Sequence, residues 1–376
     1  MHIVSFLVDP RAYRDRVLMW QRAAERVGTM TLLTAVPRPE LAWPTSSALR
    51  IVPLGPGPLR RQPARLALMR WWEAQPRPPE ILHDAQGFML PLFARVGRGG
   101  PVRLTSTFAS TWDWFTHLRG RHPVEWGVRE ARYWSHLALE WSLARVSDAF
   151  TVFGEGHRAP FARAYRVPLD RVFSIPNCVD PHGFSPDGPT TATGFAGDGP
   201  VLLFVGQLFR YKGVHELLEA VAALPGVRLL LVGTAPGQAE AVVRARIDAL
   251  GLATRVRIAG AVPHEALPGL LRAADVVVLP SYTEGSPRVL IEAMACGRPI
   301  VGTDIPGIAT LDPQGTCIVR VPRADAGALT AALARVLADP SAAAAAGARA
   351  HQRYLAHHTP EAAGDALAAL YRQLVP

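Results

Sequence analysis

LLFVGQLFRYKGVHELLEA, residues 202–220, reads as a strand, a loop and a helix in succession. Its first four residues are apolar, as in a strand buried on both faces, and Gly206 ends that run. A polar and aromatic loop follows, and Gly213 opens a segment with apolar residues at helical spacing. The same order returns after VRLLLVG (227–233) and DVVVLP (275–280). This alternation predicts an α/β fold with a doubly wound parallel sheet.

Strand and helix patterns alternate through the first half of the chain as well. Between the halves lies HGFSPDGPTTATGFAGDG, residues 182–199, which is rich in Gly, Pro and Thr, has no apolar period and reads as a linker. We therefore predict two Rossmann-like domains that face each other across a cleft, residues 1–185 and 186–357. A C-terminal helix at about 358–376 is expected to pack back on the first domain.

The charge of the chain is unevenly distributed. Of 376 residues with a net charge of +9, residues 1–185 carry the whole surplus and all nine tryptophans. Such a basic half can meet nucleic acid, an anionic membrane surface or a phosphorylated substrate. No recognition helix or RNA-binding signature accompanies it, so we expect no nucleic-acid partner. A GC-rich genome would produce the same excess of arginine. Lys212 is the only lysine in the sequence.

Several classes of protein are excluded by simple counts. Three cysteines are too few for a disulfide framework, and their spacing fits no zinc site. The N-terminal segment reaches charged residues too soon for a signal peptide, and no window approaches 18 apolar residues. A cytoplasmic location is therefore expected. Residues 60–77 combine five arginines with Trp71 and Trp72. They form either a contact with an anionic leaflet or a solvated helix with its tryptophans in the core.

The segment with the strongest chemical signal is PSYTEGSPRVLIEAMACGRP, residues 280–299. Ser286 and Pro287 look like a helix N-cap followed by a proline in the first turn. Gly285 before them permits close approach of a ligand to the backbone. A helix that begins in this way directs free N–H groups at the carboxyl end of a strand, which is a combination that binds phosphate.

Two glutamates bracket that helix start. Glu284, in the loop, can reach the hydroxyls of a ligand, and Glu292, about two turns into the helix, can accept hydrogen bonds from a vicinal diol. An ordinary loop with one capping acid and one acid on the helix face would show the same spacing.

Two cations follow the first strand of the second half. Arg210 and Lys212 lie in the loop after Gly206. A guanidinium and an ammonium at the carboxyl end of a strand suit a pyrophosphate, since the charge of that leaving group must be neutralised. Two solvated surface cations are the alternative interpretation.

These segments together resemble the nucleotide-sugar domain of retaining GT-B glycosyltransferases of family 4, the glycosyl transferase group 1 type. Glu284 and Glu292 match the Glu-x7-Glu pattern of that family. The resemblance covers about residues 145–325. The matching stretches are IPNCVD (175–180) with Phe184, GQLFRYKG (206–213), VRLLLVGTAPG (227–237), RVRIAGAVPHEAL (255–267) and ADVVVLPSYTEGSPRVLIEAMACGRPIVGTDIPG (274–307).

The resemblance implies a role for each matched residue. Glu284 would bind hydroxyls of the donor sugar, and Glu292 the ribose hydroxyls. Lys212 would hold the donor diphosphate together with Arg210, and Gly285 would offer it a backbone amide. The remaining donor-binding positions implied by the match are Gly206, Gln207, Gly233, Ser286 and Pro287.

The sequence departs from the family pattern in two places that concern the donor and the acceptor. Gln207 stands where members carry arginine, and Arg210 is the candidate to supply that charge. VDPRAYR (8–14) replaces the glycine-rich loop of the family, which places acceptor binding there in question.

A third departure concerns a histidine that contacts the donor sugar in many members. Here the corresponding strand ends at Thr107, and the next histidine is His117, followed by Arg119. We take these three residues as acceptor or sugar candidates. His83 lies at the end of another strand, and a single histidine in such a position more often has a structural role than a catalytic one.

The resemblance implies a retaining hexosyltransferase that uses a UDP-, GDP- or ADP-sugar and no metal or other cofactor. The acceptor would be the hydroxyl of a glycan or polyprenyl-linked glycan, in the assembly of cell-surface polysaccharide or glycolipid. Peripheral attachment to an anionic membrane, at its inner face, would fit the basic half. A sugar-nucleotide epimerase of the same fold and an inactive sugar-nucleotide-binding protein are the alternatives.

Overall fold

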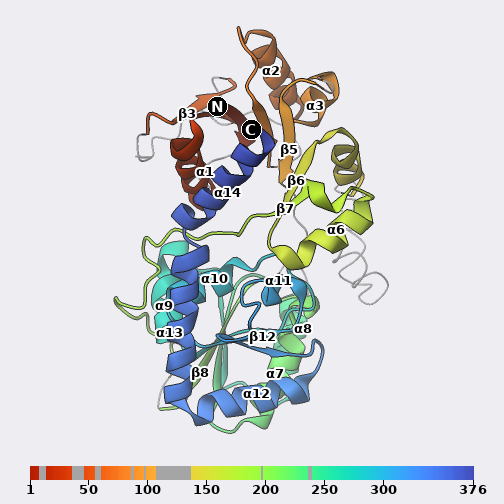
Figure 1. Ribbon diagram of the computed structural model, residues 1–376. Coiled ribbons are helices and arrows are strands. Elements are labelled where there is room, and N and C mark those ends of the chain that lie inside the picture. Colours follow the sequence, from red (N-terminus) through yellow and green to blue (C-terminus); the bar gives the residue numbers. More distant parts are fainter. Residues whose placement is uncertain are drawn as a thin grey trace. The chain divides into compact units, whose positions relative to one another are not determined.

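The protein is described by a computed structural model as two compact units, each built on one parallel sheet flanked by helices (Figure 1). The described residues up to Cys178 and from Pro360 onward form unit 1, and those from Val179 to Thr359 form unit 2. The predicted doubly wound α/β architecture is confirmed in both units. The structure describes residues 1–7, 14–35, 46–55, 61–85, 89–96, 99–106, 137–195, 198–235 and 239–376.

In the described part of unit 1, seven parallel strands pair in the order β3-β2-β1-β4-β5-β6-β7. The strands are β1 His2–Leu7, β2 Thr29–Thr34, β3 Leu49–Pro53, β4 Ile81–Asp84, β5 Val102–Ser106, β6 Ala149–Val152 and β7 Val172–Ser174. The helices whose bounds are described are α1 Arg14–Val27, α2 Arg61–Glu73, α3 Leu90–Val96, α6 Arg158–Tyr165 and α14 Pro360–Leu374, with short 3₁₀ turns at η2 Glu155–His157 and η3 Leu169–Arg171. Residues 137–146 are also helical.

Strand β1 contributes side chains to two hydrophobic clusters, one on each face of the sheet. Successive side chains of a strand point to opposite faces of the sheet. Ile3 and Leu7 join the cluster that contains Trp20 and α14, whereas Val4 and Phe6 join the cluster under α2 and α3. Both faces of the sheet are therefore covered, which is why β1 is apolar on both sides.

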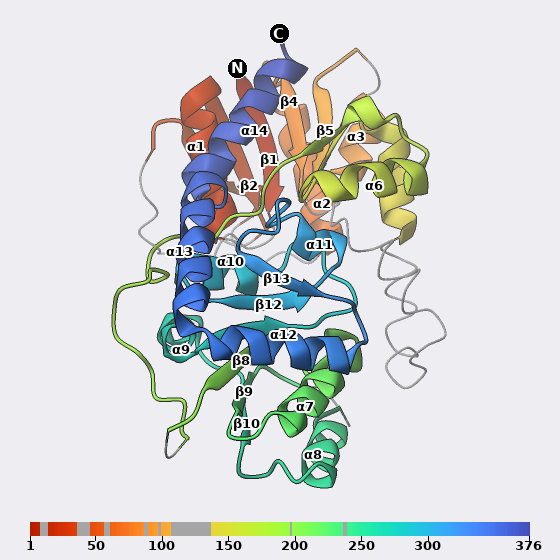
Figure 2. The same ribbon diagram turned by 60° about the horizontal axis from the view of Figure 1, so that its bottom comes forward.

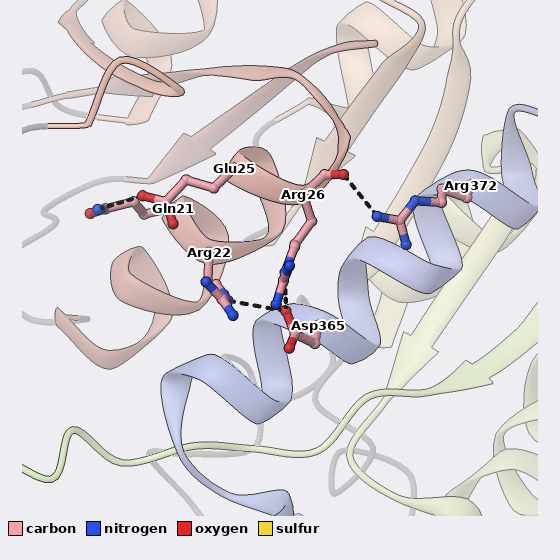
Figure 3. A network of polar contacts seen from close by, with 6 residues as sticks. All are labelled: Gln21, Arg22, Glu25, Arg26, Asp365 and Arg372. Carbon is pink, nitrogen blue, oxygen red and sulfur yellow. Dashed lines mark hydrogen bonds and ion pairs between the residues drawn. The ribbon is translucent and has the colours of Figure 1, made fainter.

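Helix α14 lies along α1 of unit 1 (Figure 3). Asp365 of α14 accepts hydrogen bonds from Arg22 Nε at 3.1 Å and Arg26 Nε at 2.9 Å, and Arg372 NH2 donates to the carbonyl of Arg26 at 2.8 Å. These ion pairs are partly exposed, so each contributes at most about 1 kcal/mol. The buried side chains of α14, Tyr371 among them, supply the larger part of the attachment by packing on α1 and the sheet.

His83 of β4 lies in this same core. Its Nδ1 is 2.7 Å from the hydroxyl of Tyr371, and its Nε2 is 2.7 Å from the hydroxyl of Ser106. The ring also meets Trp20 edge-on. His83 is 1% exposed, and burial together with the charge of Arg16 lowers its pKa to about 3. It is a neutral histidine that joins α14 to the sheet.

The buried imidazole makes stability depend on pH. Its pKa is about 3 in the folded chain against an ordinary 6.5, so the unfolded chain binds the proton first as pH falls. The neutral His83 imidazole makes its full contribution to the free energy of unfolding above pH 6.5. That contribution is lost toward pH 3, at about 1.4 kcal/mol per pH unit. Between pH 7 and pH 5 we expect the wild type to lose about 2 kcal/mol more unfolding free energy than His83→Gln, measured by urea titration. Equal losses in both proteins would contradict this assignment.

In the described part of unit 2, six parallel strands pair in the order β10-β9-β8-β11-β12-β13. The strands are β8 Val201–Val205, β9 Arg228–Val232, β10 Val256–Gly260, β11 Val276–Leu279, β12 Ile300–Thr303 and β13 Ile318–Val321. The helices are α7 Val214–Ala223, α8 Ala239–Ala249, α9 Leu267–Ala273, α10 Arg288–Ala295, α11 Pro306–Ala309, α12 Ala326–Ala338 and α13 Pro340–His357, with 3₁₀ turns at η4 Arg210–Lys212 and η5 His264–Ala266.

The helices of unit 2 form two groups around this sheet (Figure 2). Helix α7 lies between α8 and α12 and contacts both, and α10 contacts both α9 and α13 in the second group. The last two long helices begin at side-chain caps: Asp325 accepts a hydrogen bond from the N–H of Ala328, and Asp339 from that of Ala342. Such caps satisfy backbone donors that a helix start leaves free. They therefore fix where α12 and α13 begin.

The division between the units differs from the predicted boundary at residue 185. Val179 and Phe184 both pack in the core of unit 2, and the chain therefore enters that unit after Cys178. The N–H of Val179 also donates to the carbonyl of His358, at 3.0 Å. The linker-like composition that set the prediction begins only after these anchoring residues. Among the described helices, none has the length and apolar character needed to cross a membrane.

Candidate functional site

The sheet order of unit 2 creates a topological switch point between β8 and β11. From β8 the chain winds outward through β9 and β10, and from β11 it winds the other way through β12 and β13. Open α/β sheets bind ligands at the carboxyl ends of the two strands on either side of such a reversal. Here those ends are followed by the loop with Lys212 and by the loop with Glu284.

Lys212 and Glu284 form an ion pair at this point. Lys212 Nζ donates to Glu284 Oε1 at 2.7 Å, and the two side chains are 18% and 12% exposed. Burial alone would lower the pKa of Lys212, but the Glu284 carboxylate outweighs burial and holds that pKa above its ordinary value. The sole lysine of the chain is therefore a charged, largely buried ammonium at the carboxyl edge of the sheet.

Backbone packing fixes the two loops against each other. Gly213 has a left-handed backbone, with φ of 73°, and a Cβ there would clash with the carbonyl oxygen of Pro280. The N–H of Tyr282 donates to the carbonyl of Tyr211 at 2.8 Å. On the other side, a Cβ at Gly307 of α11 would clash with the carbonyl oxygen of Glu284. Only side-chain rotation can therefore separate Lys212 from Glu284 without moving the backbone.

Tyr282 is a site residue that the sequence analysis did not single out. Its hydroxyl donates to Glu216 Oε1 of α7 at 2.6 Å, so it ties the loop of Glu284 to the helix that follows Lys212. Burial and the bond to Glu216 raise the pKa of this phenol. The tyrosine stands two residues before Glu284, but nothing in the sequence pairs it with α7.

Glu292 of α10 is buried, with 5% of its side chain exposed, and two basic side chains lie against it. His264 Nε2 is 3.3 Å from Glu292 Oε1, and Arg288 NH2 is 3.8 Å from the same oxygen. The His264 ring also packs on Phe184, at 5.2 Å between centroids. His264 was not predicted as a site residue, although it follows the carboxyl end of β10, where such residues are expected.

Gly206 and Gly233 lie at the carboxyl ends of β8 and β9 with their backbones in close approach. A Cβ at Gly233, whose φ is 137°, would clash with the carbonyl oxygen of Gly206. The N–H of Gly206 donates to Val232 and that of Gly233 to Gly260, so the three strand ends are joined. Because the two glycines have no side chains, they present only main-chain atoms at the carboxyl edge of the sheet.

Arg210 and Gln207 are both exposed in the loop after β8. The charge of Arg210 acts on His215, where it adds to burial in lowering the pKa, and it opposes the rise in the pKa of Tyr282. Its guanidinium therefore influences the start of α7. The structure brings Lys212 to Glu284, and it places Arg210 toward His215 and Tyr282.

The expected cap at Ser286 is wrong. Helix α10 begins at Arg288, its N-cap residue is Pro287, and no side chain caps it. A residue before proline is pushed away from helical backbone angles, and Pro287 itself is extended, with ψ of 108°. Gly285 and Ser286 therefore belong to the loop and not to the first turn of the helix.

The acceptor candidates Thr107, His117 and Arg119 lie outside the described residues. The same holds for residues 8–13, most of the segment that replaces the glycine-rich loop of the family. The candidate site residues that the structure does describe all lie in unit 2.

Comparison with known proteins places this site in a family. Residues 191–353, which contain Lys212, Glu284 and Glu292, match the family described as Glycosyl transferases group 1. The match supports the resemblance to group 1 glycosyltransferases that the sequence shows.

Curated relatives of this chain are named as glycosyltransferases. It is 34% identical over 228 residues to a D-inositol 3-phosphate glycosyltransferase of Xylanimonas cellulosilytica, over 57% of this chain and 55% of the relative. It is 34% identical over 181 residues to an alpha-D-kanosaminyltransferase of Streptomyces kanamyceticus, over 47% and 46%. The chain spans about half the length of these curated relatives. Their names favour a transferase over an epimerase.

Solved structures share the GT-B fold along the whole chain. Sucrose-phosphate synthase from Thermosynechococcus elongatus superimposes with a TM-score of 0.77 at 24% identity, over 100% of this chain and 99% of that one. Anabaena HepE in complex with UDP-glucose gives a TM-score of 0.69 at 17% identity, over 99% and 100%. At these identities the likeness establishes the fold, which is GT-B.

Proposed function

We propose that this chain transfers a hexose, with retention of configuration, from a nucleoside diphosphate sugar to a hydroxyl acceptor. The observation that carries the proposal is the buried ion pair of Lys212 and Glu284 at the switch point of a group 1 domain. A cation suited to a diphosphate and a carboxylate suited to sugar hydroxyls stand side by side there. Glu292 offers a second buried carboxylate in the same unit.

In this proposal, each site residue binds a different part of the donor. Lys212 neutralises the charge that develops on the leaving diphosphate, which is where a preorganised cation accelerates transfer most. Glu284 accepts hydrogen bonds from sugar hydroxyls, and Glu292 accepts them from the ribose diol. Gly285 and Ser286 offer backbone N–H groups to the diphosphate. The family mechanism assigns deprotonation of the acceptor to the leaving diphosphate, so no residue of this chain is proposed as base.

The identity of the donor's nucleotide is tested by measuring how each nucleotide shifts the Tm. Uridine nucleotides come first because UDP and UDP-glucose are bound in the HepE structures. A ligand that binds only the folded chain raises its Tm, by an amount that grows with ligand concentration over Kd. We expect one of UDP, GDP or ADP to raise the Tm, and the shift to be the same with EDTA, since Lys212 supplies the charge that a metal would. If neither these three diphosphates nor their hexose derivatives raised the Tm, the proposed donor site would be refuted.

The acceptor is proposed to be a glycan or polyprenyl-linked glycan that unit 1 meets at an anionic membrane, in the assembly of cell-surface polysaccharide or glycolipid. The basic surplus lies in residues 1–185, and α2 exposes Leu66, at 55%, beside Arg65 and Arg70. Trp71 and Trp72 of the same helix pack partly on the core, which favours a contact made by the arginines and Leu66. Peripheral attachment of this kind would place the protein at the inner face of the membrane.

Attachment is tested by sedimentation with phosphatidylglycerol-rich vesicles. Each basic residue near an anionic leaflet contributes about 1 kcal/mol, so Arg70→Ala should lower partitioning about fivefold. Arg244→Ala, an exposed arginine of α8 in unit 2, is the matched control and should bind as wild type. Binding should fall as salt rises. A protein that stays in the supernatant at low salt would instead point to a soluble acceptor.

A further inference from the structure

The pairing of Lys212 with Glu284 has a consequence for which ligands the site prefers. Lys212 Nζ is 2.7 Å from a carboxylate oxygen, and little of either side chain is exposed. The ammonium and the carboxylate together carry no net charge. Because an ammonium has three N–H donors, a diphosphate that binds Lys212 either replaces Glu284 or shares the lysine with it, and in both cases it lies close to the carboxylate.

The carboxylate cannot withdraw far. Gly213 packs against the carbonyl of Pro280, and Gly307 packs against the carbonyl of Glu284, in contacts that leave no room for a Cβ. The bond of the Tyr282 N–H to Tyr211 holds the two loops in register, and the Tyr282 hydroxyl anchors the second loop to Glu216. With the backbone held on both sides, Glu284 can move away from Lys212 only by rotation of its side chain.

Two anions so confined repel each other more strongly than in bulk water, because the surroundings of a largely buried pair screen charge poorly. The repulsion is offset only if Glu284 gains new hydrogen-bond donors. Sugar hydroxyls are such donors, and a free nucleoside diphosphate has none at that position. The same carboxylate therefore opposes one ligand and favours the other.

We infer that Glu284 determines specificity by competing with the diphosphate for Lys212, so that the site favours a nucleotide that carries its sugar over the free nucleoside diphosphate. This inference rests on the proposed function. It adds a role in turnover: once the sugar has moved to the acceptor, the remaining diphosphate faces an uncompensated carboxylate and dissociates faster.

The test is calorimetric titration with the nucleoside diphosphate that raises the Tm and with its hexose derivative. Glu284→Gln removes the charge and keeps the size, and we expect it to bind the free diphosphate about tenfold more tightly than wild type while binding the sugar nucleotide more weakly. Glu284→Ser should shift both affinities in the same directions, which covers the case that the glutamine variant does not fold. Glu284→Asp keeps the charge and should retain wild-type affinity for the free diphosphate. Glu240→Gln, which breaks an exposed pair of the same 2.7 Å length, should change neither affinity.

Each outcome decides between the two claims. If neutral variants bind the free diphosphate no more tightly than wild type does, the inference fails while the proposed donor site stands. If the wild type binds none of the three diphosphates and none of their hexose derivatives, the proposed function itself fails. Tighter binding by the neutral variants and by Glu284→Asp alike would show that shape, and not charge, controls affinity, and would also overturn the inference.

Discussion

Glu284→Gln is expected to lower kcat/KM for sugar transfer by about 10- to 100-fold while leaving the fold intact. The substitution preserves volume but replaces a charged acceptor by a neutral one. A hydrogen bond to a charged group contributes roughly 1.5–3 kcal/mol, which corresponds to this range. The measurement is initial rate against donor concentration, with the Tm as the check on folding.

Glu240→Gln is the matched control for this variant. Glu240 pairs with Arg244 on the surface of α8, at the same N–O distance as the Lys212–Glu284 pair but with both partners exposed. Exposed pairs contribute little to stability, so this variant should keep wild-type turnover and Tm. Near-wild-type turnover by Glu284→Gln on the identified donor would remove Glu284 from the sugar site.

Lys212→Ala is expected to weaken binding of the nucleoside diphosphate by about 100-fold and to leave binding of the free nucleoside unchanged. Truncating one partner of a largely buried, charge-assisted contact costs about 2–5 kcal/mol. The loss here combines the missing ammonium with a Glu284 carboxylate left without its cation. The Kd of each ligand, measured by calorimetry, separates contacts to the phosphates from contacts to the base and ribose.

Arg244→Ala serves as the control, because it removes one positive charge from an exposed helix of the same unit. It should alter neither Kd beyond the small effect of a distant surface charge. Equal losses for nucleoside and nucleoside diphosphate in Lys212→Ala would place the lysine away from the phosphates. The variant would then be acting through the fold of the loop.

Much of the fold followed from local pattern. The alternation of apolar strands with amphipathic segments predicted both sheets, and the C-terminal helix expected at about 358–376 is α14, Pro360–Leu374. The start of α10 was misplaced at Ser286, because a serine before proline resembles a cap, whereas Pro287 is itself the extended N-cap residue and disfavours helical angles in the residue before it. The unit boundary was misplaced because composition marks the irregular segment and not the residues that anchor it in a core.

The site was predictable in its residues but not in its pairing. Lys212 and Glu284 are 72 positions apart, and only the order of β8 and β11 in the sheet brings them together. Tyr282 and His264 escaped prediction for the same reason, since their partners Glu216 and Glu292 lie on other elements. Spacing along the chain identified strand ends, and tertiary packing selected which side chains meet there.

We propose that the carboxyl edge of β8 and β11 holds the diphosphate of a sugar nucleotide through Lys212. A crystal structure with the nucleoside diphosphate that raises the Tm most tests this directly. We expect a phosphate oxygen within hydrogen-bond distance, about 2.7–2.9 Å, of Lys212 Nζ, and the ribose hydroxyls on Glu292. A diphosphate bound elsewhere, with Lys212 contacting only Glu284, would contradict it.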